Sequence, residues 1–521
     1  MESTVKSLSA RRFWVVTALC AAVKLILHFL TNTHYELLRD EMLFFNMGEH
    51  LSAGYATVPP VTGLLAFIMH KLFGFSVFGI RFFPALMGAA SIFIMGKFIK
   101  ELGGGLSALI IACISYLLAP GFLLTGTLFT PNSLEELIWL IIMLLVFRMV
   151  KYEKPELWIY IAILTGIGFL NKYSILFLVA GILISFVMTG KWRLLMSKYL
   201  IAGIIIGLVI ISPNLVWQYN HGWPVLIHMI ELKSSQLDLT GFAGFPLSLF
   251  AFSQGSAIIW LTGLGMLLLA GKEREHLYMG IMSAAVLLML FVLKGKGYYA
   301  LVVLPFLLAF GGYATEKYFL KELKTVTYFV LSVSVAMSLL SLPSGLPVLS
   351  YEKYHEYVGK TRNFVYHPLL VWDNGTTHDF SQAWADMTGW SELAGIVSEA
   401  YNSLSDEEKR SCTIFGERDY GYAGAVYFYG RSLNLPEAVT FHESYTFWAP
   451  DSIPQGPVIY IYRDANNMNE LFADVSEAGS VDNKYFRETG LKVFLCKSTV
   501  RDVSEIYRNL AREEKNKYSH R

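Results

Sequence analysis

The chain has 521 residues, of which 54% are hydrophobic and only 16% are charged. Because a soluble globular protein carries about 25% charged residues, this composition excludes an ordinary cytosolic enzyme and a disordered chain, and it indicates a membrane protein. The net charge of +1 hides a split, since residues 1–350 hold 24 basic and 16 acidic residues whereas residues 351–521 hold 18 and 25. Two differently solvated parts are expected, and neither is basic enough to predict a nucleic-acid partner.

Eleven apolar segments approach the ~20 residues that a membrane-spanning helix requires. They are Phe13–Leu30, Val77–Phe98, Leu106–Leu118, Leu134–Met149, Leu157–Leu170, Ile175–Met188, Leu200–Trp217, Leu247–Ala270, Leu277–Leu293, Tyr299–Gly312 and Val326–Leu342. The first segment lacks a small-residue cleavage site and is not predicted to be a cleaved signal peptide. We expect residues 1–345 to form a polytopic α-helical membrane domain with about 11 transmembrane helices.

Basic residues predict the orientation of these helices. With the N-terminus in the cytoplasm, 16 lysines and arginines fall on the inner side and seven on the outer side. The same alternation places the acidic residues 351–521 outside the cytoplasm. The first outer loop, residues 31–76, is long and contains amphipathic stretches at Met42–Leu51 and Leu64–Phe73, which we expect to lie in the membrane surface.

Residues 346–521 are predicted to form a soluble extracytoplasmic α/β domain, joined through the Pro/Ser/Gly-rich stretch 341–350. The predicted strands are Cys412–Phe415, Val458–Tyr462 and Leu491–Cys496. The predicted helices are Glu392–Leu404, Met468–Ala478 and Val503–Glu514. Cys412 and Cys496 could form a disulfide bond, but two unpaired cysteines inside strands are the favoured interpretation.

The triplet Arg39-Asp40-Glu41 directly follows the first predicted span. In one interpretation it is the polar start of a helix, because Asp is a favourable N-cap. In the other, a carboxylate is positioned to take a proton from an acceptor hydroxyl. The sequence leaves both interpretations open.

Several lysines break the positive-inside pattern. Lys294, Lys296, Tyr298 and Tyr299 open a predicted span on the outer side, and Lys172 lies at another outer junction. A phosphate group outside the membrane would require such cations, with tyrosine hydroxyls as further donors. Lysines that extend toward the interface beside interfacial tyrosines are the structural alternative.

Other polar residues have two interpretations as well. Glu135 and Glu136 enter a span from outside, where a carboxylate requires a cavity, a partner or shallow depth. Arg81 is either a cation at a helix start or a ligand, and His221 is either a turn residue or a ligand. Nucleotide and hydrolase motifs are absent from the sequence, so an activated substrate is expected to arrive through the membrane.

The sequence contains no motif that predicts a particular metal or cofactor site. A divalent cation is possible, since oxygen ligands could come from Asp40, Glu41 and Glu136, but nothing in the sequence shows that these side chains converge. Metal dependence therefore stays open.

The order of these motifs resembles a known family. Its motifs here are Asp40-Glu41, Gly54-Tyr55-Ala56-Thr57-Val58-Pro59-Pro60, Leu72-Phe73-Gly74, Gly79-Ile80-Arg81-Phe82-Phe83-Pro84, Asn171-Lys172-Tyr173 and Ser212-Pro213-Asn214. Over most of residues 10–345 the chain is similar to the protein-mannosyltransferase-like, or aminoarabinose-transferase-like, membrane glycosyltransferases of the GT-C fold. The later motif Asp419-Tyr420-Gly421-Tyr422-Ala423-Gly424-Ala425 looks like the soluble domain often attached to bacterial members.

The resemblance implies inverting transfer of a monosaccharide from a polyprenyl-phosphate carrier to a hydroxyl of an envelope glycolipid, polysaccharide or protein, outside the cytoplasm at the bacterial inner membrane. Asp40 matches the family's first-loop catalytic aspartate, with Glu41 beside it. The Lys294–Tyr299 segment falls where such proteins bind the carrier phosphate.

The sequence also departs from the family pattern. Val58 stands where many relatives have Lys or His, so Lys172 or Lys296 is the candidate to replace that contact. Asn132 is neutral where relatives often have an acid, and Glu135 or Glu136 is the candidate there. A flippase or transporter of lipid-linked sugars and a non-catalytic glycan-binding scaffold are the alternative functions.

Overall fold

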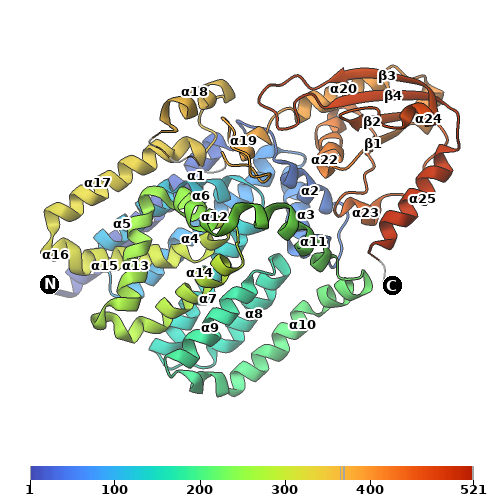
Figure 1. The fold of residues 1–521 in the computed structure, drawn as a ribbon. Helices are drawn as coiled ribbons and strands as arrows, with labels where there is room; N and C mark the ends of the chain where they lie inside the picture. Colours follow the sequence, from blue (N-terminus) through green and yellow to red (C-terminus); the bar gives the residue numbers. More distant parts are fainter. Residues whose placement is uncertain (1, 364, 366, 368–369, 519–521) are drawn as a thin grey trace. The chain divides into compact units, whose positions relative to one another are not determined.

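The computed structural model describes residues 2–363, 365, 367 and 370–518. The chain divides into two compact units, each assembled from separate stretches of sequence (Figure 1). The first unit contains residues 1–32, 81–213 and 231–381, and the second contains residues 33–80, 214–230 and 382–521. Residues 33–76 of the predicted first outer loop therefore group with the C-terminal residues. The predicted domain boundary at residue 345 stays a prediction.

The first unit is helical. Its main helices are α1 (Glu2–Thr31), α4 (Val77–Glu101), α5 (Leu106–Leu118), α6 (Pro120–Thr127), α7 (Pro131–Lys151), α8 (Leu157–Asn171), α9 (Ile175–Met188), α10 (Lys198–Asn220), α12 (Asp238–Ser253), α13 (Ala257–Leu269), α14 (Leu277–Val292), α15 (Leu304–Ala314), α16 (Leu320–Glu322), α17 (Lys324–Ser341) and α18 (Tyr351–Thr361). Helix α15 is apolar on all sides and every one of its 11 residues is buried, so it forms the centre of this unit, where it contacts α5 and α13.

All the predicted spans fall on helical segments, which confirms a polytopic α-helical membrane protein. Within the described residues, six helices are long and apolar enough to cross a membrane, or up to seven if the bent pair α5–α6 is one span. Helix α7 has 21 residues and at 1.5 Å per residue is long enough, but it carries Glu135, Glu136 and Arg148. The count of 11 spans stays a prediction.

The second unit combines short helices with one sheet. Its helices are α2 (Arg39–Met47), α3 (Val61–Phe73), α11 (Pro224–Leu232), α19 (Gln382–Ala385), α20 (Trp390–Asn402), α21 (Asp406–Ser411), α22 (Tyr420–Phe428), α23 (Tyr445–Trp448), α24 (Met468–Leu471) and α25 (Val503–Asn516). Its strands are β1 (Thr413–Gly416), β2 (Val458–Tyr462), β3 (Phe472–Ser480) and β4 (Lys492–Thr499), in the order β1-β2-β4-β3. Only the β1–β2 pair is parallel.

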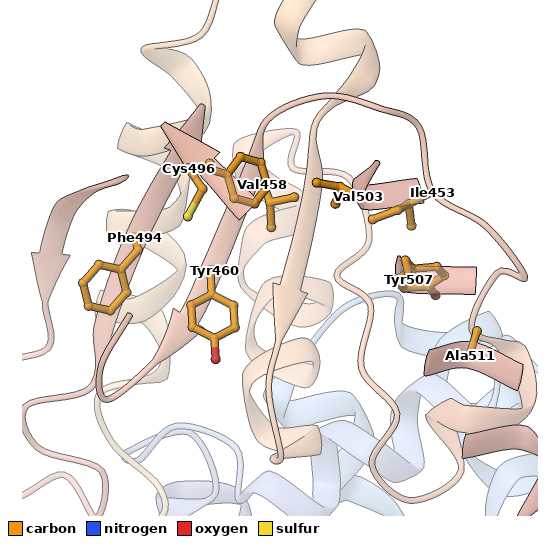
Figure 2. Close-up of a cluster of buried hydrophobic side chains, with 9 residues drawn as sticks. Ile453, Val458, Tyr460, Phe494, Cys496, Val503, Tyr507 and Ala511 are labelled. Carbon is orange, nitrogen blue, oxygen red and sulfur yellow. The ribbon is translucent and has the colours of Figure 1, made fainter. Parts of the chain in front are cut away.

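An apolar core joins this sheet to α25. Val503, Tyr507 and Ala511 follow one another at four-residue spacing, so they share one face of the helix. Figure 2 shows this face beside the strand residues Val458 and Tyr460, which lie two positions apart on β2. Helix α20 also contacts the sheet, and the sheet with its helices confirms the predicted α/β character of this region.

Most local predictions in the second unit are confirmed, but the predicted helix Met468–Ala478 is wrong. Only Met468–Leu471 is helical, and Phe472–Ser480 forms the edge strand β3, antiparallel to β4. Most residues of this edge strand are exposed, so its sequence lacks the alternation of a half-buried strand. The described cysteines are unpaired, as favoured for Cys412 and Cys496.

The predicted stretch Leu64–Phe73 is helical within α3, whereas the stretch Met42–Leu51 is helical only as far as Met47, where α2 ends. Helix α2 does not have the exposed polar face of a surface helix, however, because eight of its nine residues are buried. It packs against α3 and α22 inside the second unit. The expectation that this stretch lies in the membrane surface is therefore wrong for α2.

Candidate active site

The predicted site residues are divided between the two units. Asp40, Glu41 and His221 belong to the second unit. The first unit contains Lys172, Lys294, Lys296, Tyr298, Tyr299, Arg81 and Glu136. Each unit brings some of these side chains together, and the convergence of all of them on one pocket stays a prediction.

In the second unit, the structure describes all nine residues of α2, and Asp40 is the one among them that is not buried. It occupies the first turn, where the partial positive charge of the helix N-terminus favours a carboxylate. Glu41, the next residue, is fully buried, and its Oε2 atom accepts a hydrogen bond from the backbone N–H of Leu38 at 2.9 Å. Glu41 thus caps the helix, while Asp40 beside it is only half-buried.

Arg39 anchors this helix to the C-terminal part of the chain. Its Nε atom donates to both carboxylate oxygens of Asp386, at 2.7 and 2.9 Å. Its Nη1 atom donates to Asp419, and its Nη2 atom donates to Glu488 at 3.2 Å. The guanidinium group also lies 5.5 Å from the ring centre of Trp390. One buried cation therefore holds three carboxylates from separate segments.

Charge and burial oppose each other at this centre. Burial raises the pKa of Asp386 to about 6, against the attraction of Arg39 and Arg487, so its carboxylate is ionised at neutral pH. Burial also disfavours the Arg39 cation, but Asp386 and Asp419 raise the pKa of Arg39 well above its ordinary value. The arginine is therefore positively charged at neutral pH.

A second contact joins the loop before α2 to the start of α20. The carboxylate of Glu36 accepts hydrogen bonds from the backbone N–H groups of Trp390 at 2.8 Å and Ser391 at 3.3 Å. These N–H groups belong to the first turn of α20, which has no intrahelical acceptor for them. Glu36 therefore caps a helix that lies more than 350 residues later in the sequence.

The hydroxyl group of Tyr420 donates a hydrogen bond to Oδ1 of Asp40. Burial and the nearby Asp40 carboxylate raise the pKa of Tyr420 well above its ordinary value, so the hydroxyl keeps its proton. Sequence analysis did not identify Tyr420 as a site residue. The motif that contains it was noted, but its contact with Asp40 spans 380 positions.

His221 lies at the end of α10. Its Nδ1 atom is 2.8 Å from the backbone oxygen of Trp217, so this nitrogen carries the proton. Its ring stacks on the Trp217 ring at a centroid distance of 4.1 Å. These contacts fit the turn-residue interpretation of His221.

In the first unit, Lys172 lies beside the rings of Tyr298 and Tyr299. Its Nζ atom lies 4.8 Å from the ring centre of Tyr299 and 5.8 Å from that of Tyr298. The same atom donates to Asn132 Oδ1 at 2.7 Å and to Glu135 Oε2 at 3.0 Å. The structure thus joins the Lys172 and Tyr298-Tyr299 parts of the predicted phosphate site.

The other predicted cations of the first unit have separate partners. Lys296 forms an ion pair with Asp373 at 2.7 Å, and Lys294 lies 5.5 Å from the ring centre of Phe242. Arg81 is fully buried, and its Nη1 atom donates at 2.6 Å to the backbone oxygen of Asn32, just beyond the end of α1. A cation is favourable at that end of a helix, which supports the structural interpretation of Arg81.

Glu136 has a different environment from Glu135. It accepts a hydrogen bond at 2.5 Å from Tyr116 of α5, and the Lys24 ammonium lies 5.1 Å from the same tyrosine ring. Lys24 itself donates at 2.6 Å to the backbone oxygen of Phe122. Of the two acidic candidates on α7, Glu135 therefore contacts Lys172, whereas Glu136 belongs to a buried polar cluster with Tyr116 and Lys24.

Among the described residues, Glu273, Glu275 and His276 place ligand atoms close enough together for a metal ion. Lys317 already pairs with Glu273 at 2.9 Å and would repel a bound cation. Of the carboxylates considered as ligands of a divalent cation, Glu41 accepts a hydrogen bond from the backbone N–H of Leu38. A divalent-cation site stays a prediction.

A known sequence family and a curated protein are similar to parts of this chain. The sequence family described as dolichyl-phosphate-mannose-protein mannosyltransferase matches residues 57–217. The lipid A galacturonosyltransferase RgtD of Rhizobium johnstonii is 24% identical over 199 residues, which is 37% of this chain and 41% of that protein. The matched region therefore spans less than half of this curated relative.

Solved structures match over nearly the whole chain. The structure of ArnT from Cupriavidus metallidurans bound to undecaprenyl phosphate has a TM-score of 0.61 at 16% identity and covers 92% of this chain and 98% of that one. The apo structure of the same protein has a TM-score of 0.62 at 16% identity and covers 94% and 98%. The chain therefore has the GT-C fold of ArnT, and the resemblance predicted from the sequence is confirmed at the level of the fold.

Replacing Arg39 by Met should destabilise the second unit by about 3–5 kcal/mol, because it leaves buried carboxylates without their cation. Urea-dependent pulse proteolysis of the full chain measures this. The matched control is Arg463→Met, which removes a half-exposed arginine from the same Glu488 and should cost at most about 1 kcal/mol. Equal stability of the two variants would contradict the anchoring role of Arg39.

Proposed function

We propose that the protein is an inverting glycosyltransferase that moves a monosaccharide from a polyprenyl-phosphate carrier to a hydroxyl group of an envelope glycolipid. The observation that carries this proposal is Asp40, the one residue of α2 that is not buried, on a helix that is otherwise enclosed. A carboxylate held in this way can accept the proton of an acceptor hydroxyl. The leaving phosphate requires cations rather than a proton, and Lys172 is the strongest candidate to supply one.

The comparisons support the substrate classes. One relative is named as a lipid A galacturonosyltransferase, and one structural neighbour is bound to undecaprenyl phosphate. A lipid A-like glycolipid is therefore our preferred acceptor over a polysaccharide or a protein. The positive-inside pattern supports a site on the extracytoplasmic side of the bacterial inner membrane.

The phosphate would bind near Lys172 and the tyrosine pair. An ammonium group with tyrosine hydroxyls nearby suits a lipid phosphate, because hydrogen bonds to an ionised group are the strong ones. Glu135 pairs with Lys172 and would orient it. Lys294 and Lys296, from the segment that leads into Tyr298, are further candidates for this site.

A flippase or transporter of lipid-linked sugars is the second candidate. The buried polar cluster of Lys24, Tyr116 and Glu136 favours it, because ionisable groups inside membrane helices are typical of transport pathways. A transporter does not require Asp40 as a base, so a substitution at Asp40 separates the two functions.

Asp40→Asn should abolish sugar transfer while the protein still folds and binds undecaprenyl phosphate. The expected loss is at least about 100-fold, since a positioned base contributes 10²–10⁴-fold. Mass spectrometry of envelope glycolipids, from cells with the wild type or the variant in place of the native protein, detects the added sugar without knowledge of its identity. Asp451→Asn, at an exposed ion pair of the same unit, is the control. Full transfer by Asp40→Asn would contradict the proposal.

Lys172→Met should weaken the binding of undecaprenyl phosphate by about 10- to 100-fold, the contribution of one hydrogen bond to an ionised group. Binding to the purified protein in lipid nanodiscs measures this. Lys317→Met is a close control, because Lys317 also pairs with a glutamate and lies near two tyrosine rings, Tyr313 and Tyr318. If both variants lose affinity equally, or if neither variant loses affinity, Lys172 is not part of the phosphate site.

A further inference from the structure

Helix α22 lies directly against the N-terminal part of α2. A Cβ atom at Gly424 would come within 2.9 Å of the Cβ atom of Met42, and one at Gly421 would come within 3.3 Å of the Cβ atom of Arg39. Such distances are too short for ordinary side-chain contact, so the two glycines allow the close approach. The first turn of α22 is thereby brought next to the first turn of α2.

Asp419 fixes the position of the first turn of α22. Its Oδ1 atom accepts a hydrogen bond from the backbone N–H of Gly421 at 2.6 Å and caps α22. Its Oδ2 atom accepts from Nη1 of Arg39. The backbone N–H of Tyr420 donates to Nδ1 of His442 at 3.2 Å. The backbone around Tyr420 is thus fixed by Asp419 and by His442, independently of its side chain.

The side chain of Tyr420 then reaches Asp40. Both residues are half-buried, and the hydrogen bond between them is only partly enclosed. Because the raised pKa keeps Tyr420 protonated, its hydroxyl is a permanent donor to the carboxylate. A donor at Oδ1 restricts rotation of the carboxylate and stabilises its ionised form.

We propose that Tyr420 is a positioning residue for Asp40, so that the C-terminal part of the chain completes the active centre of the first outer loop. This inference rests on the proposed function, in which Asp40 is the base. The other titratable and charged groups around the pair are Arg39, Asp386, Asp419, His442 and Glu443. All of them remain in the variant that tests the proposal.

Tyr420→Phe removes the hydroxyl and keeps the ring. The rate of sugar addition to glycolipid in membrane vesicles should fall by about 10- to 100-fold, the contribution of one hydrogen bond to an ionised group. The acid limb of the pH–rate profile should move up by about one pH unit, since Asp40 is then easier to protonate. Tyr429→Phe is the matched control, because that hydroxyl also contacts the first loop, at the backbone N–H of Leu37, 2.8 Å away.

A second measurement does not depend on transferase activity. A water-soluble carbodiimide modifies protonated carboxyl groups, and peptide mass spectrometry of the full-length protein follows the modification of Asp40 against pH. The midpoint should rise in Tyr420→Phe and stay unchanged in Tyr429→Phe. Wild-type midpoint and wild-type rate in Tyr420→Phe would overturn the positioning role. The midpoint could instead rise in Tyr420→Phe although even the wild-type protein adds no sugar. That result would leave the positioning role intact and contradict the proposed function.

Discussion

The second unit depends on one buried guanidinium group. Arg39 holds Asp386, Asp419 and Glu488, which come from three separate parts of the C-terminal chain. A cation that is removed from water requires such partners, and each carboxylate requires the cation in return. Since Arg39 is the first residue of α2, this interaction couples the first outer loop to a domain that lies more than 340 positions away.

The coupling explains how a half-buried aspartate can have a defined geometry. Asp40 follows Arg39 directly, and Tyr420 follows Asp419 directly, so the ion pair between Arg39 and Asp419 brings the other two residues together. Loops that carry reactive groups usually require support from rigid elements. Here the support is supplied by α22 and by the Glu36 cap on α20.

Much of the architecture could be predicted from the sequence, because apolar helices and the first-loop carboxylates are local signals. Contacts between distant segments were not predictable, and Tyr420 was missed for this reason. The roles of Glu135 and Glu136 were also left open, since adjacent helical residues point about 100° apart and periodicity does not show which one faces Lys172. Strand β3 was mistaken for a helix because its exposed residues lack alternation.

The contacts of Arg39, Glu36 and Tyr420 require the first outer loop and the C-terminal residues to fold as one cooperative unit. Hydrogen exchange of the full-length protein, followed by mass spectrometry as urea is increased, tests this cooperativity most directly. In one cooperative unit, the amides of α2 and α22 should have the same free energy of opening and the same dependence on urea. Exchange of α2 at a much lower free energy, while α22 stays protected, would contradict it.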